Sequence, residues 1–192
     1  MTEVSLEQGI WPNQYRQKPL LNNVNDILFA DESTDLPVTL AEAKAWALLE
    51  TTDFDSLVTA LIDVARQQCE DFTGISIITR NITVILSNSN GNIYLPYGPV
   101  QTDSGQSVVL YDKDDAIITD AIIRGLEFPY IESPACDYIK AVYNAGYDVI
   151  PEKIKAAIKA QVAYLFDNRG DAQAMATLSP IAQTILKPIS RK

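Results

Sequence analysis

The sequence predicts an α+β fold that is mainly helical: a helical bundle with an inserted β-hairpin or small antiparallel sheet and an extended N-terminal arm. Amphipathic patterns over residues 39–49, 55–72 and 152–169 predict three helices. Between residues 75 and 145 the composition shifts to Ile, Val and Thr in short alternating runs, which is typical of strands. Residues 1–36 show neither the helical nor the strand period, and we therefore expect them to form the arm.

The arm, residues 1–36, is interrupted by two prolines and holds a cluster of asparagines. Trp11, Tyr15 and Phe29 make its composition unlike that of a free tail, because disordered segments are poor in large apolar side chains. Two alternatives stay open at this point. The arm either wraps its own domain or orders against a neighbouring subunit.

Residues 37–178 are expected to form the core. Thr39 and Glu42 have the spacing of a capping box, which starts the first helix, and Trp46 is expected on the inward face of that helix. The second helix stops at Gly74, because glycine accepts the left-handed conformation that ends helices.

The longest helical pattern follows Pro151, whose fixed φ suits the first turn of a helix. Ile154, Ile158 and Val162 recur at intervals of four residues, so this helix is expected to bury one side. Between the second and third helices, residues 75–86 predict a strand.

After that strand comes a turn cluster, residues 87–91, and residues 93–95 are expected to pair back as a hairpin. Residues 112–115 (DKDD) hold three carboxylates in four positions. They lack the glycine and the distal glutamate of a calcium loop, so a solvated turn is predicted.

Residues 179–192 are expected to form a short last helix, at 181–186, and a basic tail. Residues 171–192 carry a net positive charge, because Lys187, Arg191 and Lys192 outnumber Asp171. A basic tail on an acidic body suits docking to a partner of different charge.

The 192-residue chain has a formal net charge of −10 and no histidine. The missing histidine removes Ser-His-Asp and Cys-His catalysis and most zinc sites, and no common phosphate-binding glycine loop occurs. We therefore expect no enzyme activity, metal or cofactor, although a mechanism that uses only carboxylates is compatible with this composition. The acidity argues against a broad grip on nucleic acid, yet it lets a duplex slide past without sticking.

Apolar runs stay well short of the roughly 20 residues that a membrane helix needs, and the N-terminus does not read as a secretory signal. Cys69 and Cys136 are therefore expected to remain reduced, as in a cytosol. Tyrosines gather between residues 94 and 147, and tyrosine is enriched at protein interfaces. We expect Tyr94 and Tyr97 to lie in subunit contacts; packing within a small sheet is the alternative.

Five segments, taken in order, resemble the head–tail connector (adaptor) family of tailed bacteriophages. They are residues 38–46 (VTLAEAKAW), 57–74 (LVTALIDVARQQCEDFTG), 95–100 (LPYGPV), 142–147 (VYNAGY) and 151–169 (PEKIKAAIKAQVAYLFDNR). The ending at residues 185–191 (ILKPISR) is similar to the last helix of the family and its basic end. The arm is longer than the family pattern, and residues 101–134 are extended relative to compact members.

The resemblance implies a structural protein of the virion neck, between head and tail, assembled in the cytoplasm of a bacterial host. It implies a dodecameric ring that docks on the portal protein after DNA packaging, offers a platform for the stopper or tail-completion protein, and lets DNA pass through its lumen. The residues expected to dock on the portal are Ile181, Ile185, Leu186, Lys187, Ile189, Arg191 and Lys192. Those expected at the subunit interface are Trp11, Tyr15, Phe29, Tyr94 and Tyr97.

One alternative function stays open beside the connector ring. A DNA-packaging accessory protein would bind nucleic acid directly, and it would need a basic groove for that purpose. Salt-dependent retention on duplex DNA distinguishes the two.

Overall fold

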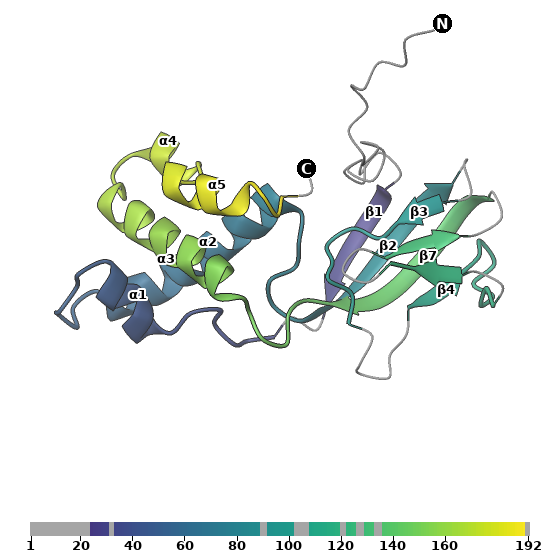
Figure 1. Cartoon of the computed structure of the whole chain (residues 1–192), viewed down its shortest axis with the longest axis horizontal. Coiled ribbons are helices and arrows are strands. Elements are labelled where there is room, and N and C mark those ends of the chain that lie inside the picture. The colour runs from purple at the N-terminus through teal and green to yellow at the C-terminus, as the bar shows by residue number, and fades with distance from the viewer. Residues whose placement is uncertain are drawn as a thin grey trace, which may run out of the picture.

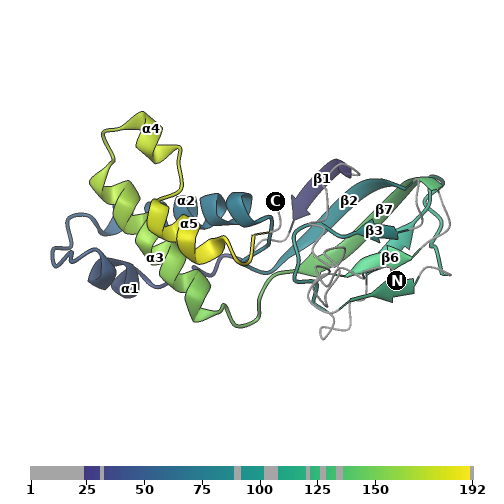
Figure 2. The same cartoon turned by 45° about the horizontal axis from the view of Figure 1, so that its top comes forward.

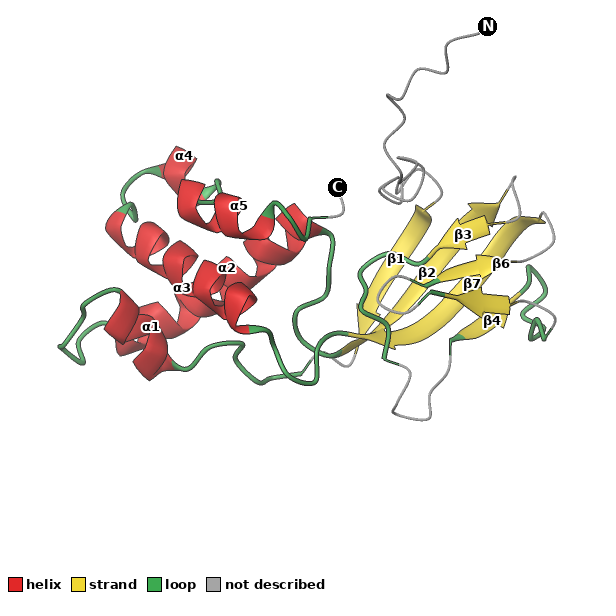
Figure 3. Ribbon diagram, viewed as in Figure 1, coloured by secondary structure: helices red, strands yellow, loops and turns green. Residues whose placement is uncertain are grey.

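The protein is divided into a helical lobe and a β lobe, which lie side by side along the longest axis (Figure 1). The computed structural model describes residues 24–30, 33–88, 92–101, 108–119, 122–125, 129–132 and 136–190. Figure 3 shows the helices gathered at one end, the strands at the other, and irregular segments joining them. The turned view in Figure 2 keeps the two lobes apart.

The expectation of a mainly helical fold is wrong. The described residues contain seven strands in two antiparallel sheets. These sheets form a lobe that, like the helical lobe, has its own apolar core. Several of these strands are three residues long, too short to show a period in the sequence. They are held by pairing with distant segments, which local patterns do not reveal.

The helical lobe contains every helix among the described residues. Its elements are α1 (Leu40–Trp46), α2 (Asp55–Thr73), α3 (Glu152–Asp167), α4 (Ala172–Met175) and α5 (Pro180–Leu186). α1 and α3 end two or three residues earlier than the sequence predicts, and α2 matches within one residue. Its core is built mainly from α2 and α3, and it includes Ile62, Ile154, Ile158, Leu165 and Leu186.

Local capping explains where these helices begin and end. The capping box at α1 is confirmed: the Thr39 hydroxyl accepts from the backbone N–H of Glu42, and the Glu42 carboxylate accepts from the backbone N–H of Thr39. α2 ends as expected at Gly74, which has a φ of 70°. Trp46 is 47% exposed, so the expectation that it faces inward is wrong.

The β lobe combines a four-stranded and a three-stranded sheet, with all pairs antiparallel. The first has the order β1 (Val24–Ala30), β2 (Arg80–Asn88), β7 (Cys136–Ala145) and β4 (Val109–Tyr111). The second has the order β3 (Asn92–Tyr94), β6 (Tyr130–Glu132) and β5 (Ile122–Arg124). One apolar cluster contains buried residues of both sheets, among them Ile82 and Val84 of the first and Ile93 and Ile131 of the second.

Two pairings in this lobe differ from what the sequence suggested. Residues 93–95 were expected to pair back on the preceding strand, but β3 pairs with β6 through Ile93 and Ile131. Part of the expected arm, β1, pairs with β2 from Val24 to Ala30. Residues 1–23 lie outside the described residues. Among the described residues, no helix combines the length and the apolar character needed to span a membrane.

Candidate assembly surfaces

A buried charged network joins the two lobes. The Glu70 carboxylate, on α2, accepts from Arg66 of the same helix at 2.8 Å and from Arg80, the first residue of β2, at 3.3 Å. It also accepts from the backbone N–H of Ile77 at 2.6 Å. All three charged residues are at most 6% exposed. Because a buried charge is costly without partners, this network fixes the helical lobe against the sheet.

Close backbone contact reinforces the same junction. Gly146, at the end of β7, has a φ of 133°, and an added Cβ would lie 2.4 Å from the carbonyl oxygen of Ile78. Its N–H donates to the carbonyl of Pro99 at 2.9 Å. The segments that enter and leave the β lobe therefore cross in contact, at a point where only glycine fits.

Two of the residues expected at the subunit interface meet beside the junction. The Phe29 and Tyr97 rings lie edge to face with their centroids 5.1 Å apart, and the Arg80 guanidinium stacks 4.1 Å from the centroid of Phe29. Phe29 is 38% exposed and Tyr97 is half-buried. Burial is the main cause that raises the pKa of Tyr97, so its hydroxyl stays protonated at neutral pH.

The other expected interface residues are separated from this pair. Tyr94, on β3, is 44% exposed, and its ring centroid lies 5.6 Å from that of Tyr130 on the neighbouring strand. Trp11 and Tyr15 lie outside the described residues. The structure thus brings Phe29 and Tyr97 together and places Tyr94 on the second sheet.

The residues expected to dock on the portal divide by exposure. Ile181 is 61% exposed and Lys187 is exposed, so both offer contacts to a partner. Ile185 and Ile189 are half-buried against the helical core. Leu186 is fully buried, so its side chain holds α5 in place rather than facing a partner. Arg191 and Lys192 lie outside the described residues.

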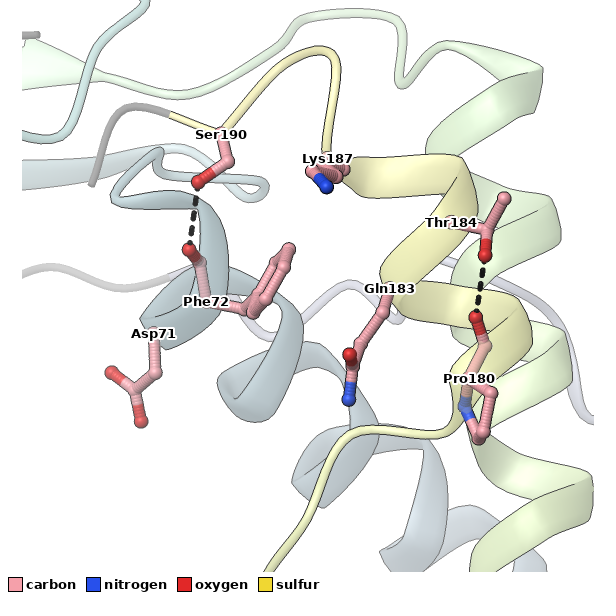
Figure 4. A pocket seen from close by; sticks show the side chains of 7 residues that line it. All are labelled: Asp71, Phe72, Pro180, Gln183, Thr184, Lys187 and Ser190. Carbon is pink, nitrogen blue, oxygen red and sulfur yellow. Dashed lines mark hydrogen bonds between the residues drawn. The ribbon is translucent and has the colours of Figure 1, made fainter.

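A groove of about 730 Å³ lies between the end of α2 and α5 (Figure 4). The Ser190 hydroxyl donates to the backbone carbonyl of Phe72 at 3.1 Å and thereby ties the segment after α5 to the end of α2. Each helix contributes one apolar ring to the groove, Phe72 from α2 and Pro180 from α5, and the polar side chains on the α5 side form its wall. Its lining includes Asp71, Phe72, Pro180, Gln183, Thr184 and Lys187.

Sequence reasoning missed an apolar surface at the opposite end of α2. In the α1–α2 loop and its flanks, Trp46 is 47% exposed, Leu48 88%, and Phe54 and Leu57 each 36%. We call these four residues the apolar knob. The only signal in the sequence was the Leu48–Leu49 pair after Trp46, which the helical pattern had absorbed as a continuing helix.

The described residues show no arrangement of His, Cys, Asp or Glu that could hold a metal ion. Asp112 is the anchor of the acidic turn at residues 112–115: its carboxylate accepts from the backbone N–H groups of Asp114 and Ala116 at 2.9 Å each. Burial raises the pKa of the Cys69 thiol to about 12, so this buried cysteine is a protonated core residue rather than a nucleophile.

Comparison with solved structures identifies the fold. The chain is similar to a chain in the neck of an empty gene transfer agent particle with sixfold symmetry. The TM-score is 0.62 at 18% identity, over 86% of this chain and 95% of the other. The chain has the fold of a neck protein from a phage-like particle. No protein-family model matches the sequence, and no curated protein does.

Two further structures share this neck-protein fold. A chain in the virion of a native gene transfer agent particle has a TM-score of 0.61 at 20% identity, over 83% of this chain and 94% of that one. A chain in the neck of the native particle, computed with twelvefold symmetry, has a TM-score of 0.53 at 17% identity. At these identities the likeness establishes the fold, which agrees with the resemblance found in the sequence.

Proposed function

We propose that this protein is a structural component of the virion neck, where copies of the chain form the head–tail adaptor ring. The observation that supports the proposal most is the extent of the fold match. It covers nearly the whole of a chain found in a particle neck, 95% of that chain and 86% of this one. A match confined to one lobe would not have argued for a shared role.

In the proposed assembly, α5 and the residues that follow it dock on the portal. Ile181 presents an exposed apolar contact on the side of α5 away from the groove, and Lys187 presents an exposed charge at the end of α5, at the edge of the groove. Leu186 anchors the helix to the core, so this outer face is held in a fixed place. The formal net charge of −10 suits a lumen through which DNA passes without sticking, because like charges repel.

The mass of the purified protein, measured alone and with portal-bearing heads, tests the proposal. A ring-sized species, or a monomer that becomes a ring on the portal, supports it. A chain that stays monomeric and ignores the portal contradicts it. Retention on duplex DNA at low salt, lost as salt rises, would instead support the DNA-packaging alternative.

The docking contact is tested by the pair Ile181→Asp and Leu186→Ala. The first variant should fold normally and lose attachment to portal-bearing heads, since the side chain of Ile181 is exposed. The second should lose both stability and attachment. Normal attachment of the Ile181→Asp variant would remove α5 from the docking surface.

A further inference from the structure

Within the apolar knob, Phe54 lies edge to face with Phe166 and Lys159 lies over the Trp46 ring, so Leu48 is the member that the described residues cover least. Leu48 has a φ of 54°, in the left-handed region that bulky residues avoid, and its side chain is 88% exposed. Glycine would relieve the strain and remove the exposed apolar surface together. A leucine at this position is therefore explained by a contact made outside the subunit.

The backbone around Leu48 holds the side chain in its exposed position. The N–H of Leu49 donates to the carbonyl of Lys44 at 3.0 Å, and the N–H of Leu48 donates to that of Ala45 at 3.4 Å. These two bonds are the pair that defines a Schellman motif, with Leu48 in the position usually taken by glycine. Leu48 is thus presented on a fixed turn, so its backbone has little entropy left to lose on binding.

The groove between α2 and α5 has the features that complement this knob. Phe72 and Pro180 give it an apolar lining, and Lys187 supplies a positive charge at its wall. Residues 47–57, which carry most of the knob, contain three carboxylates and no basic residue. One of the three, Asp55, is paired with Lys44 at 2.5 Å, which leaves Glu50 and Asp53 to face a partner. Asp71 balances Lys187 in the groove lining, so the apolar contact with Phe72 and Pro180 supplies the match and Lys187 gives one local attraction for an acidic side chain.

The knob and the groove lie at opposite ends of α2, which has 19 residues and is about 28 Å long. One subunit cannot bring its own knob into its own groove across that distance. A second copy can, and the contact is then of the head-to-tail kind that closes into rings. With about 28 Å between successive contacts, a ring of twelve has a contact radius of about 54 Å.

We infer that the apolar knob of one subunit packs into the α2–α5 groove of the next copy around the ring. This inference rests on the proposed function, because it assumes that the copies form a ring. It adds the surfaces that touch and the direction of the contact. It also assigns two roles to α5, whose outer face docks on the portal while its α2-facing side receives the neighbour.

Substitutions of Leu48 give the first test. Leu48→Gly should leave the melting temperature unchanged or raise it, because it relieves the positive φ, and it should weaken subunit association at least tenfold. Leu48→Asp should also abolish rings. Val149→Asp is the matched control, since Val149 is 82% exposed and belongs to neither surface, and it should assemble like the wild type. Assembly of the Leu48→Asp variant at wild-type concentrations would overturn the inference.

Cross-linking gives the second test, in a chain where Cys136 is replaced by serine. The double variant Leu48→Cys, Thr184→Cys should form a ladder of disulfide-linked oligomers when rings are oxidised, alone or on portal-bearing heads. Neither single variant should form more than dimers. Rings without the ladder would overturn this contact and leave the proposed function intact. Failure to form rings under any condition would overturn both.

Discussion

The charged network at the junction predicts a large loss of stability when Glu70 is replaced by alanine. The carboxylate is 3% exposed and lies between Arg66 and Arg80. Its removal takes a carboxylate away from the buried guanidinium of Arg80, whose other neighbours include the Ser76 hydroxyl, at 2.9 Å, and the Phe29 ring. Arg66 is less affected, because it keeps an ion pair with Asp63 at 2.7 Å.

The magnitude follows from the burial of the pair. Removing one partner of a buried ion pair destabilises a protein by about 3–5 kcal/mol, because an uncompensated charge stays behind. In a chain of this size, each kcal/mol lowers the melting temperature by about 2–4 °C. Glu70→Ala should therefore lower it by roughly 6–20 °C. Glu70→Gln should lose less, since an amide oxygen can still accept from the backbone N–H of Ile77.

The assays are thermal unfolding and urea unfolding at neutral pH, both followed by near-UV and far-UV circular dichroism. The matched control is Glu152→Ala, which removes an exposed helical pair with Lys155 at 3.0 Å and should lose less than about 1 kcal/mol. The network variant should also unfold in two steps, because the lobes have separate cores. If Glu70→Ala and Glu152→Ala have equal midpoints and single transitions, the network does not couple the lobes.

Four further substitutions have defined outcomes. Gly146→Ala should destabilise the fold by about 3 kcal/mol or more, since its Cβ would meet backbone atoms of the crossing segment; wild-type thermal stability would refute this. Leu186→Ala should lower the free energy of unfolding by about 2–5 kcal/mol in urea, whereas Lys187→Ala should leave it within about 0.5 kcal/mol. Glu42→Gln concerns pH: hydrogen bonds from Thr39 hold the pKa of Glu42 below its usual 4.5. Its stabilisation should be present above pH 4.5 and fade as pH falls through the lowered pKa, so a stability difference between Glu42→Gln and wild type that persisted unchanged at pH 2 would contradict it.

The features set by neighbouring residues could be read from the sequence. The Thr39–Glu42 capping box and the stop at Gly74 depend on a few adjacent positions, and both are confirmed. The two long helices, α2 and α3, were predicted because an apolar stripe repeats over several turns of each. The predicted docking and interface residues rest mostly on residue type and on the family resemblance, and neither of these specifies which side chains are exposed.

The features that depend on residues far apart in the chain could not be predicted from the sequence. β3 pairs with β6, more than 30 residues away, and nothing in three residues specifies that partner. The exposure of Leu48 depends on where α1 ends. The burial of Leu186 depends on how α5 packs on α3. The Glu70 network joins α2 to β2, and the pattern within α2 does not show that Arg80, ten residues further along the chain, becomes a partner of Glu70.

The order of the elements along the chain sets the timing of assembly during synthesis. Every described strand precedes α3, so the described part of the β lobe can close once Ala145 has left the ribosome. The helical lobe cannot, because half of its core comes from α3 and α5, within the last 41 residues of the chain. Because α5 forms one wall of the groove and would carry the proposed docking face, a nascent chain lacks both surfaces until α5 has been synthesised. If the groove receives a neighbouring copy as proposed, a subunit cannot recruit that neighbour before α5 has been synthesised and has folded.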